Sequence, residues 1–203
     1  MDQYEQVEQK FGFVLPEAYR SMSEAGWSDG ESDSYFWLYD AEWRSSAQIL
    51  DHAPAEYHKP GFVPFARTGG GDSWCWWPSA HPEIVIFCPH DDQNGKYYSP
   101  SFLGFIYRSL LDFSLDYYGI IDPQENPKEA IELLRASVIR LSGYFPDEWR
   151  ETLEALTSAS LVRRTPSDED SRLGLLTEEQ YQAIVRRDLA FPLLDQEFQW
   201  MYP

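Results

Sequence analysis

Three consecutive glycines, Gly69, Gly70 and Gly71, most constrain how this chain can fold. They stand between two apolar runs that favour β-strands, residues 62–66 and 73–77, and Asp72 follows them directly. Glycine loses more conformational freedom on folding than any other residue, so three in a row indicate left-handed backbone or the close approach of another group. The segment therefore predicts a sharp corner between two strands, in which Asp72 bonds backbone N–H groups.

The residues around this corner predict both helices and strands. Apolar residues at helical spacing predict a helix over 3–10, and Pro16 is placed to open a second one that ends near Gly26. The further elements expected up to residue 118 are strands at 35–39, 84–88 and 96–98, helices at 41–50 and from Ser99-Pro100 onward, and a tight turn at Asn94-Gly95. The uninterrupted apolar run 84–88 is typical of a central strand.

This order of elements predicts an α+β fold, with a mainly antiparallel sheet flanked by helices. We expect residues 1–120 to form that domain and residues 121–203 to form a helical extension packed on it. The extension is expected to contain helices at 128–141, after Pro146 and from the capping box at Thr177 to Arg187, a charged loop at 163–172, and an aromatic segment at 191–202 that returns to the sheet.

The charge of the chain limits its partners. There are 34 acidic and 16 basic residues, a formal net charge of −18. A field of this sign repels phosphate backbones and anionic membranes, so direct binding to nucleic acid or to a membrane is not expected. Two interpretations stay open: the charge confers only solubility, or it steers the protein toward a basic partner.

The cysteines and the first residues of the chain predict a cytoplasmic protein. If strands 73–77 and 84–88 pair, Cys75 faces position 86 and Cys88 is out of register, so no disulfide is expected. Two unpaired thiols favour a reducing compartment. The polar, acidic start is unlike a signal peptide, and no apolar run approaches the roughly 20 residues that span a bilayer.

No catalytic, cofactor or metal site is predicted. A phosphate-binding loop needs Gly-Lys-Ser/Thr entering a helix, whereas here Asp72 and a β-prone run follow the glycines. His90, Asp91 and Asp92 invite a metal hypothesis, but a calcium loop that uses Gly95 fails at both ends, and zinc would need more His or Cys nearby. The chain also lacks a Gly-x-Ser-x-Gly nucleophile motif.

The tryptophans at 74, 76 and 77 are either core residues or part of a binding surface. Because side chains alternate along a strand, Trp74 and Trp76 are expected on one face and Cys75 and Trp77 on the other. Large aromatic side chains prefer burial, which favours the core for at least one face. An exposed tryptophan would supply an anchor for a partner.

Four segments together resemble the SUKH superfamily, which includes yeast cell-wall assembly regulators and many bacterial immunity proteins. The segments are residues 11–19 (FGFVLPEAY), 61–65 (GFVPF), 69–72 (GGGD) and 101–106 (SFLGFI). Each is weak alone, and their order and separation make the resemblance specific. It covers roughly residues 1–118.

The resemblance implies a non-catalytic module that binds a cognate protein toxin, often a nuclease, and holds it inactive. A basic, nuclease-like toxin would match the negative charge of the chain. The residues predicted to contact such a partner are Asp29, Glu31, Asp33, Gly69, Gly70, Gly71, Asp72, Trp74, Trp77, Asp91 and Asp92. The alternative is a regulatory scaffold of the cell-wall-regulator kind, and a third hypothesis is an enzyme that uses Asp72, His90 and Asp91. No oligomeric state is predicted.

Overall fold

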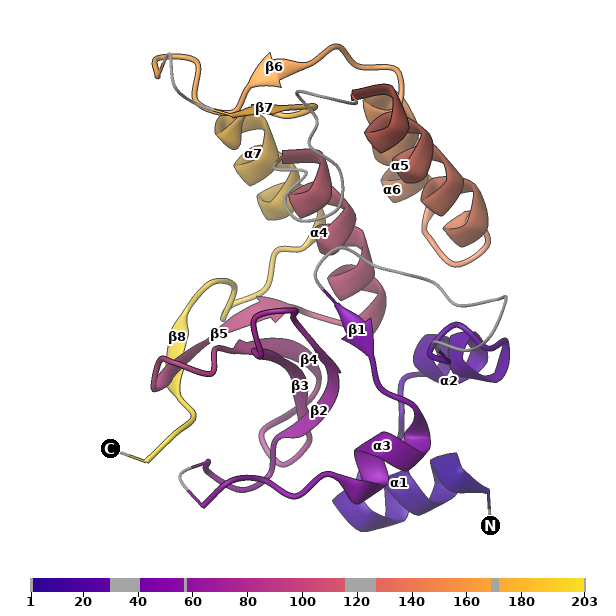
Figure 1. Cartoon of the computed structure of the whole chain (residues 1–203), viewed down its shortest axis with the longest axis vertical. Helices are drawn as coiled ribbons and strands as arrows, with labels where there is room; N and C mark the ends of the chain where they lie inside the picture. The colour runs from indigo at the N-terminus through magenta and orange to yellow at the C-terminus, as the bar shows by residue number, and fades with distance from the viewer. Residues whose placement is uncertain (1, 30–40, 57, 116–126, 169–171, 203) are drawn as a thin grey trace. The chain divides into compact units, whose positions relative to one another are not determined.

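The computed structural model describes residues 2–29, 41–56, 58–115, 127–168 and 172–202. The chain forms two compact units: unit 1 is Met1–Phe105 with Phe191–Pro203, and unit 2 is Ile106–Ala190. Helix α4 (Phe102–Leu115) begins in unit 1 and continues into unit 2. Helices and a largely antiparallel sheet make up the chain, as the predicted α+β class requires (Figure 1).

A six-stranded sheet is the centre of unit 1. Its strands lie in the order β1 (Glu42–Trp43), β2 (Val63–Arg67), β3 (Ser73–Trp77), β4 (His81–Cys88), β5 (Asn94–Ser99) and β8 (Glu197–Gln199). All five neighbouring pairs are antiparallel. Strand β8 comes from the end of the chain and pairs with β5, so the predicted return of the aromatic segment 191–202 to the sheet is confirmed.

One face of the sheet packs against aromatic side chains of the helices and the segments that follow them. The fully buried Trp76 ring lies 5.0 Å from the ring of Tyr19, which comes from a helix, and 4.3 Å from that of Phe65 in the neighbouring strand β2, centroid to centroid. Trp74, on the same face, lies 5.0 Å from Phe105 of α4. Trp74 and Trp76 therefore share a face, and that face belongs to the core.

The opposite face of the sheet is also covered, by the C-terminal segment. Cys75, Ile86 and Cys88 form a buried cluster with Trp200 and Met201 of that segment. Cys75 lies directly opposite Ile86, as predicted, and both cysteines are free thiols. Cover on both faces explains why the apolar run of β4 has no polar alternation, and it confirms the predicted central strand.

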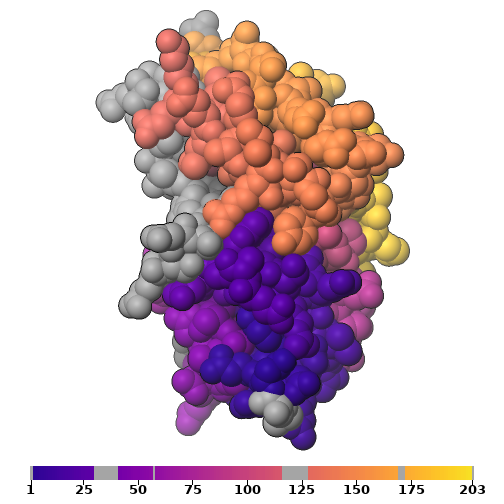
Figure 2. Space-filling model, turned by 90° about the vertical axis from the view of Figure 1, so that its right-hand side faces the viewer, coloured from indigo at the N-terminus to yellow at the C-terminus, as the bar shows by residue number. Residues whose placement is uncertain are grey.

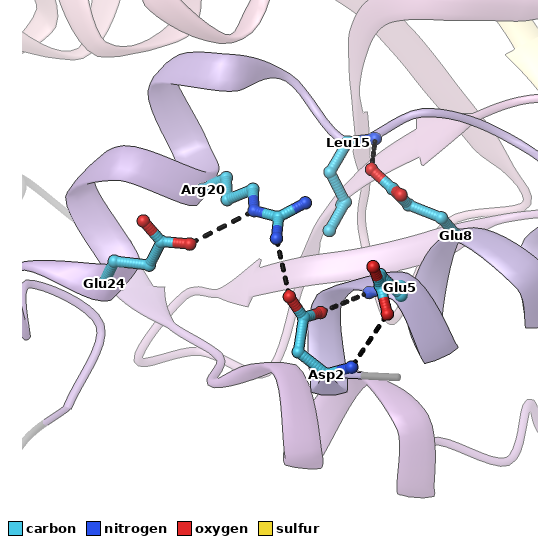
Figure 3. A network of polar contacts seen from close by, with 6 residues as sticks. All are labelled: Asp2, Glu5, Glu8, Leu15, Arg20 and Glu24. Carbon is cyan, nitrogen blue, oxygen red and sulfur yellow. Dashed lines mark hydrogen bonds and ion pairs between the residues drawn. The ribbon is translucent and has the colours of Figure 1, made fainter.

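The two N-terminal helices, α1 (Gln3–Phe11) and α2 (Glu17–Glu24), are joined by the polar network of Figure 3. Asp2 accepts a hydrogen bond from the Glu5 N–H, and the Glu5 carboxylate accepts one from the Asp2 N–H, which is a capping box. Arg20 of α2 pairs with Asp2 at 2.6 Å. The surface of these helices, indigo in Figure 2, is exposed on the side of the molecule shown there.

The predicted helix over 41–50 is wrong at its start. Residues Glu42 and Trp43 form the short edge strand β1, opposite Arg67 and Ala66, and helix α3 (Ser46–Asp51) begins only afterwards. Ser45 caps α3 in a capping box with Gln48. This Ser-x-x-Gln pattern marks the true beginning of the helix. The strand predicted at 35–39 lies outside the described residues.

The tight turn predicted at Asn94-Gly95 is also wrong, because both residues belong to β5 and pair with β8. Gly95 is required there by close packing instead. A Cβ atom on Gly95 would lie 2.6 Å from the Phe87 carbonyl oxygen and 2.7 Å from Cζ of Phe198. The glycine lets the aromatic ring of β8 lie directly against the backbone of β5.

Unit 2 contains the predicted helices of the second part of the chain. Besides the rest of α4, its elements are α5 (Pro127–Leu141), α6 (Asp147–Leu156), β6 (Val162–Arg163), β7 (Leu173–Gly174) and α7 (Glu178–Asp188). Thr177 caps α7 as predicted. The ends of the segment predicted as a charged loop pair with each other as β6 and β7. Among the described residues, no helix has both the length and the apolar character needed to cross a membrane.

The packing around Gly95 leads to a stability prediction. We expect Gly95→Ala to lower the free energy of unfolding of unit 1 by about 1–3 kcal/mol, because its methyl group would overlap backbone and ring atoms. Gly143→Ala is the control, since a Cβ there meets no atom within 4 Å. Urea unfolding followed by tryptophan fluorescence measures both. Equal stability of the two variants would contradict the close contact between β5 and β8.

Candidate functional site

Two hairpin turns lie at the same end of the unit 1 sheet. The turn between β2 and β3 spans residues 68–72, and the turn between β4 and β5 spans residues 89–93. In a run of antiparallel hairpins, alternate turns fall at the same end, and the β3–β4 turn at 78–80 falls at the other. The glycine corner and the acidic turn predicted from the sequence are therefore neighbours.

The glycine segment forms the predicted corner. The Thr68 N–H donates to the Asp72 carbonyl oxygen at 3.0 Å, and the Gly71 N–H donates to the Thr68 carbonyl oxygen at 3.2 Å. Gly71 has a φ of +102°, a left-handed backbone that favours glycine. Gly69 and Gly70 are exposed and do not have the left-handed backbone of Gly71, and neither adds a side chain to the surface of the corner.

Asp72 connects the two turns. Its Oδ1 accepts hydrogen bonds from the His90 backbone N–H at 2.9 Å and from His90 Nδ1 at 2.7 Å. Its Oδ2 accepts a hydrogen bond from the Thr68 hydroxyl at 3.1 Å. The sequence predicts that Asp72 bonds backbone N–H groups of its own corner. In the structure, the backbone N–H from which its Oδ1 accepts a hydrogen bond belongs instead to His90 in the neighbouring turn. Asp72 thereby clamps residues that are far apart in the chain.

The clamp also shifts the pKa of both partners. The hydrogen bond with Asp72 raises the pKa of His90, and the negative charges of Asp91 and Asp72 add to this effect. Burial raises the pKa of Asp72, but the hydrogen bonds from His90 and Thr68 outweigh it and the net pKa is lowered. The two groups therefore form a charged pair over the pH range between these two values.

The acidic turn is fixed by the cluster beneath it. Asp92 Oδ1 accepts a hydrogen bond from the Asn94 N–H at 2.8 Å, which closes the turn locally. The backbone carbonyl of Asp92 accepts the indole N–H of the buried Trp200 at 2.8 Å. The side chains of Asp91 and Asp92 are exposed. A rigid backbone thus holds two carboxylates at the surface beside Asp72.

The structure brings together some of the residues predicted as a partner site and not others. Asp72 at the end of the glycine corner bonds His90, the neighbour of Asp91 and Asp92. The sequence places His90 with Asp72 and Asp91 only in the enzyme hypothesis, and His90 is not among the residues predicted for the partner site. Trp77 lies at the other end of β3, half-buried beside Phe198. Trp74 is only 8% exposed and packs on Phe87, Tyr98 and Phe105.

Of the remaining predicted contact residues, Asp29, which follows α2 in the chain, is the one that the structure describes. Asp29 is exposed, and its backbone N–H donates to the Gly26 carbonyl oxygen at 3.3 Å. Glu31 and Asp33 lie outside the described residues.

One group of side chains at the turns has the composition of a metal site. A ligand atom from each of Asp72, His90 and Asp91 lies within 4.8 Å of the others. Two of these groups already bond each other through His90 Nδ1 and Asp72 Oδ1. Three ligands are fewer than the four of a structural zinc site or the six to eight oxygens of a calcium site, and they equal the number of protein ligands in a catalytic zinc site. The chemistry of the arrangement is that of a charged, hydrogen-bonded clamp.

The six-stranded antiparallel sheet and the helices that pack on it make unit 1 an α+β domain. Residues 2–108 match the model of the SMI1 / KNR4 family (SUKH-1). The match covers more than half of the chain, so the protein belongs to this family, and the resemblance seen in the sequence is confirmed. No curated protein and no solved structure matches the chain significantly.

The clamp between Asp72 and His90 gives a pH prediction. We expect the pKa of His90 to lie above its ordinary value of 6.5 and to return toward it in Asp72→Asn. The stabilisation from a raised histidine pKa is complete below pH 6.5 and is lost as pH rises through the folded-state value, while the Asp72 part is lost as pH falls below its ordinary 3.8.

Proton NMR titration of the His90 ring measures this shift. Asp92→Asn is the control, because it removes a carboxylate from the same turn that bonds Asn94 and not the imidazole. An unchanged His90 pKa in Asp72→Asn would show that the pair does not form in solution.

Proposed function

We propose that the protein is a non-catalytic binding module that neutralises a cognate protein toxin by covering its working surface. Membership of the SUKH-1 family supports a binding role, because the superfamily includes bacterial immunity proteins. Inhibition by contact needs no reacting group. The net charge of −18 favours a partner with a basic surface, such as a nuclease that must hold a polyanion.

The observation that carries the proposal is the rigid acidic surface formed by the two turns. Asp91 and Asp92 are exposed beside the open corner at Gly69 and Gly70, and the Asp72–His90 clamp fixes the two turns together. Charges held on a fixed backbone lose little conformational freedom when a partner binds, so their attraction is realised more fully. We call this surface, residues 68–72 with 89–93, the turn surface.

The open corner gives the partner access to backbone. A Cβ atom on Gly69 would meet no atom of the described residues within 4 Å, so the corner has room for a larger side chain at this position. A basic side chain of the toxin can approach the corner and reach Asp91 or Asp92 from there. Asp29, Glu31 and Asp33 are proposed to extend the negative surface, and the half-buried Trp77 is proposed as an aromatic contact. The buried Trp74 is assigned no direct contact.

The proposal predicts that the turn surface is needed for protection and dispensable for folding. Expression of the toxin encoded by the neighbouring reading frame should stop cell growth, and co-expression of this protein should restore it. The purified pair should form a complex that weakens as salt is added. We expect the double change Asp91→Lys and Asp92→Lys to weaken binding about tenfold or more, since two attractive charges become repulsive. Binding is measured by calorimetry at two salt concentrations.

Two matched controls test whether a loss of binding comes from the turn surface itself, from the change in total charge or from unfolding. Glu132→Lys with Glu151→Lys makes the same charge change on exposed positions of α5 and α6, and is expected to change affinity far less. Gly69→Trp should block binding, whereas Gly143→Trp, at an equally open position, should not. Full protection by Gly69→Trp would contradict the turn surface. A neighbouring product that is harmless, with binding to several endogenous proteins instead, would favour the regulatory scaffold.

A further inference from the structure

A pocket of about 380 Å³ lies in unit 1 beside the edge strand β1. Its charged and polar lining residues come from β1 and the residue after it, from α3 and the residue after it, and from the last position of β2: Glu42, Arg44, Gln48, Asp51, His52 and Arg67. This volume is within the range of small-molecule sites, which runs from about 300 to 1,000 Å³. None of these residues belongs to the turn surface.

The strand geometry places the charges together. Glu42 and Arg44 are two positions apart along the chain, so they project to the same side of extended backbone. Arg67 lies directly opposite Glu42 in the strand pairing and projects to that side as well. Trp43, between the two, packs with Tyr19 and Phe102 on the helix-covered side. The sheet thus separates an aromatic face from a charged one at this edge.

One of the two arginines that line the pocket is paired with a carboxylate. Arg67 Nε bonds Glu42 Oε2 at 2.7 Å, and these two neutralise each other. Arg44 forms no ion pair with any carboxylate of the described residues, and its buried Nε has no hydrogen-bond partner among them. A buried guanidinium N–H without an acceptor is costly, which is why such groups are normally bonded. Arg44 thus lines the pocket as a cation that no carboxylate of the described residues contacts.

The position of Arg44 is fixed by its neighbours. Its backbone N–H donates to the Phe65 carbonyl oxygen at 2.8 Å, and its carbonyl oxygen accepts the Tyr19 hydroxyl at 2.8 Å. Its Nη1 lies 3.4 Å from His52 Nδ1. Because a guanidinium can only donate, Nδ1 is the acceptor and His52 carries its proton on Nε2. Burial and the charge of Arg44 lower the pKa of His52, which keeps the ring neutral at pH 7.

We propose that this pocket binds a carboxylate group through Arg44, with the neutral His52 as a second donor. Carboxylate geometry matches the planar guanidinium edge. The formal charges of the lining residues sum to zero, and Arg44 is the cation that no carboxylate of the described residues contacts, so one negative charge suits the pocket better than two, which Asp51 and the net charge of the chain would repel. Phosphate, with about −1.5 to −2 charges, fits this balance less well. The inference is independent of the proposed toxin partner.

The test is an NMR titration of the full chain, observing the Nε–Hε signal of Arg44. The probes are sodium acetate, N-acetylglutamic acid α-amide and sodium phosphate, each in chloride-free buffer. We expect both carboxylates to shift the signal saturably and phosphate to bind more weakly. Tighter binding of the glutamate probe identifies an acidic protein side chain as the natural source, and tighter binding of acetate identifies a small free acid.

Variants on the same strand make the test specific. Arg44→Gln is expected to weaken carboxylate binding about tenfold or more, as followed by the signals of His52, and Arg44→Lys to weaken it less. Glu42→Gln is expected to strengthen binding several-fold, because it frees Arg67 as a second cation. This gain remains informative if Arg44→Gln fails to fold. No saturable shift, equal or tighter phosphate binding, or unchanged affinity in a folded Arg44→Gln variant would overturn the proposal.

Discussion

The packing of Trp76 against the first helices is the interaction on which unit 1 depends. Its ring is fully buried and contacts Phe13, Tyr19 and Phe65, which come from three separate segments of the chain. Such a contact brings the N-terminal helices and the sheet together in one step, and each large aromatic ring removes extensive apolar surface from water. The second face is closed in the same way by Trp200 and its neighbours.

Because both faces of the sheet are covered by other segments, its ends and edges are the parts that can meet a ligand or partner. At one end the Asp72–His90 clamp holds the glycine corner against the acidic turn, and Trp200 supports that turn from below through Asp92. The acidic surface is thus built on buried aromatic structure, which gives exposed charges a defined position. A surface held in this way loses little further conformational freedom when a partner binds these charges.

The β1 edge of the sheet has a different electrostatic character. It presents Arg44 without a carboxylate partner among the described residues, in a chain that is otherwise strongly acidic. Strand β2 connects the two regions, since Arg67 lines the pocket and Thr68 begins the glycine corner. The turn surface presents exposed carboxylates, whereas the pocket presents an arginine that no carboxylate of the described residues contacts, so the two regions suit ligands of opposite charge.

Local patterns were sufficient for much of the fold. The helical spacing, the capping box at Thr177, strand β3 and the placement of Cys75 opposite Ile86 were all readable from the chain, because each depends on neighbours a few residues apart or on one turn. The predicted helix at 41–50 and turn at Asn94-Gly95 failed because long-range pairing, with β2 and β8, overrode local preference.

The amino-acid sequence by itself determined the α+β class, the family, the negative charge and the glycine corner. Only the tertiary structure decided that Asp72 bonds His90 eighteen residues later, that Trp74 is core, and that Arg44 lines a pocket without a carboxylate partner among the described residues. The physical reason is that charge and backbone preference are properties of single residues, whereas burial and hydrogen-bond partners depend on which distant segments the folded sheet places side by side.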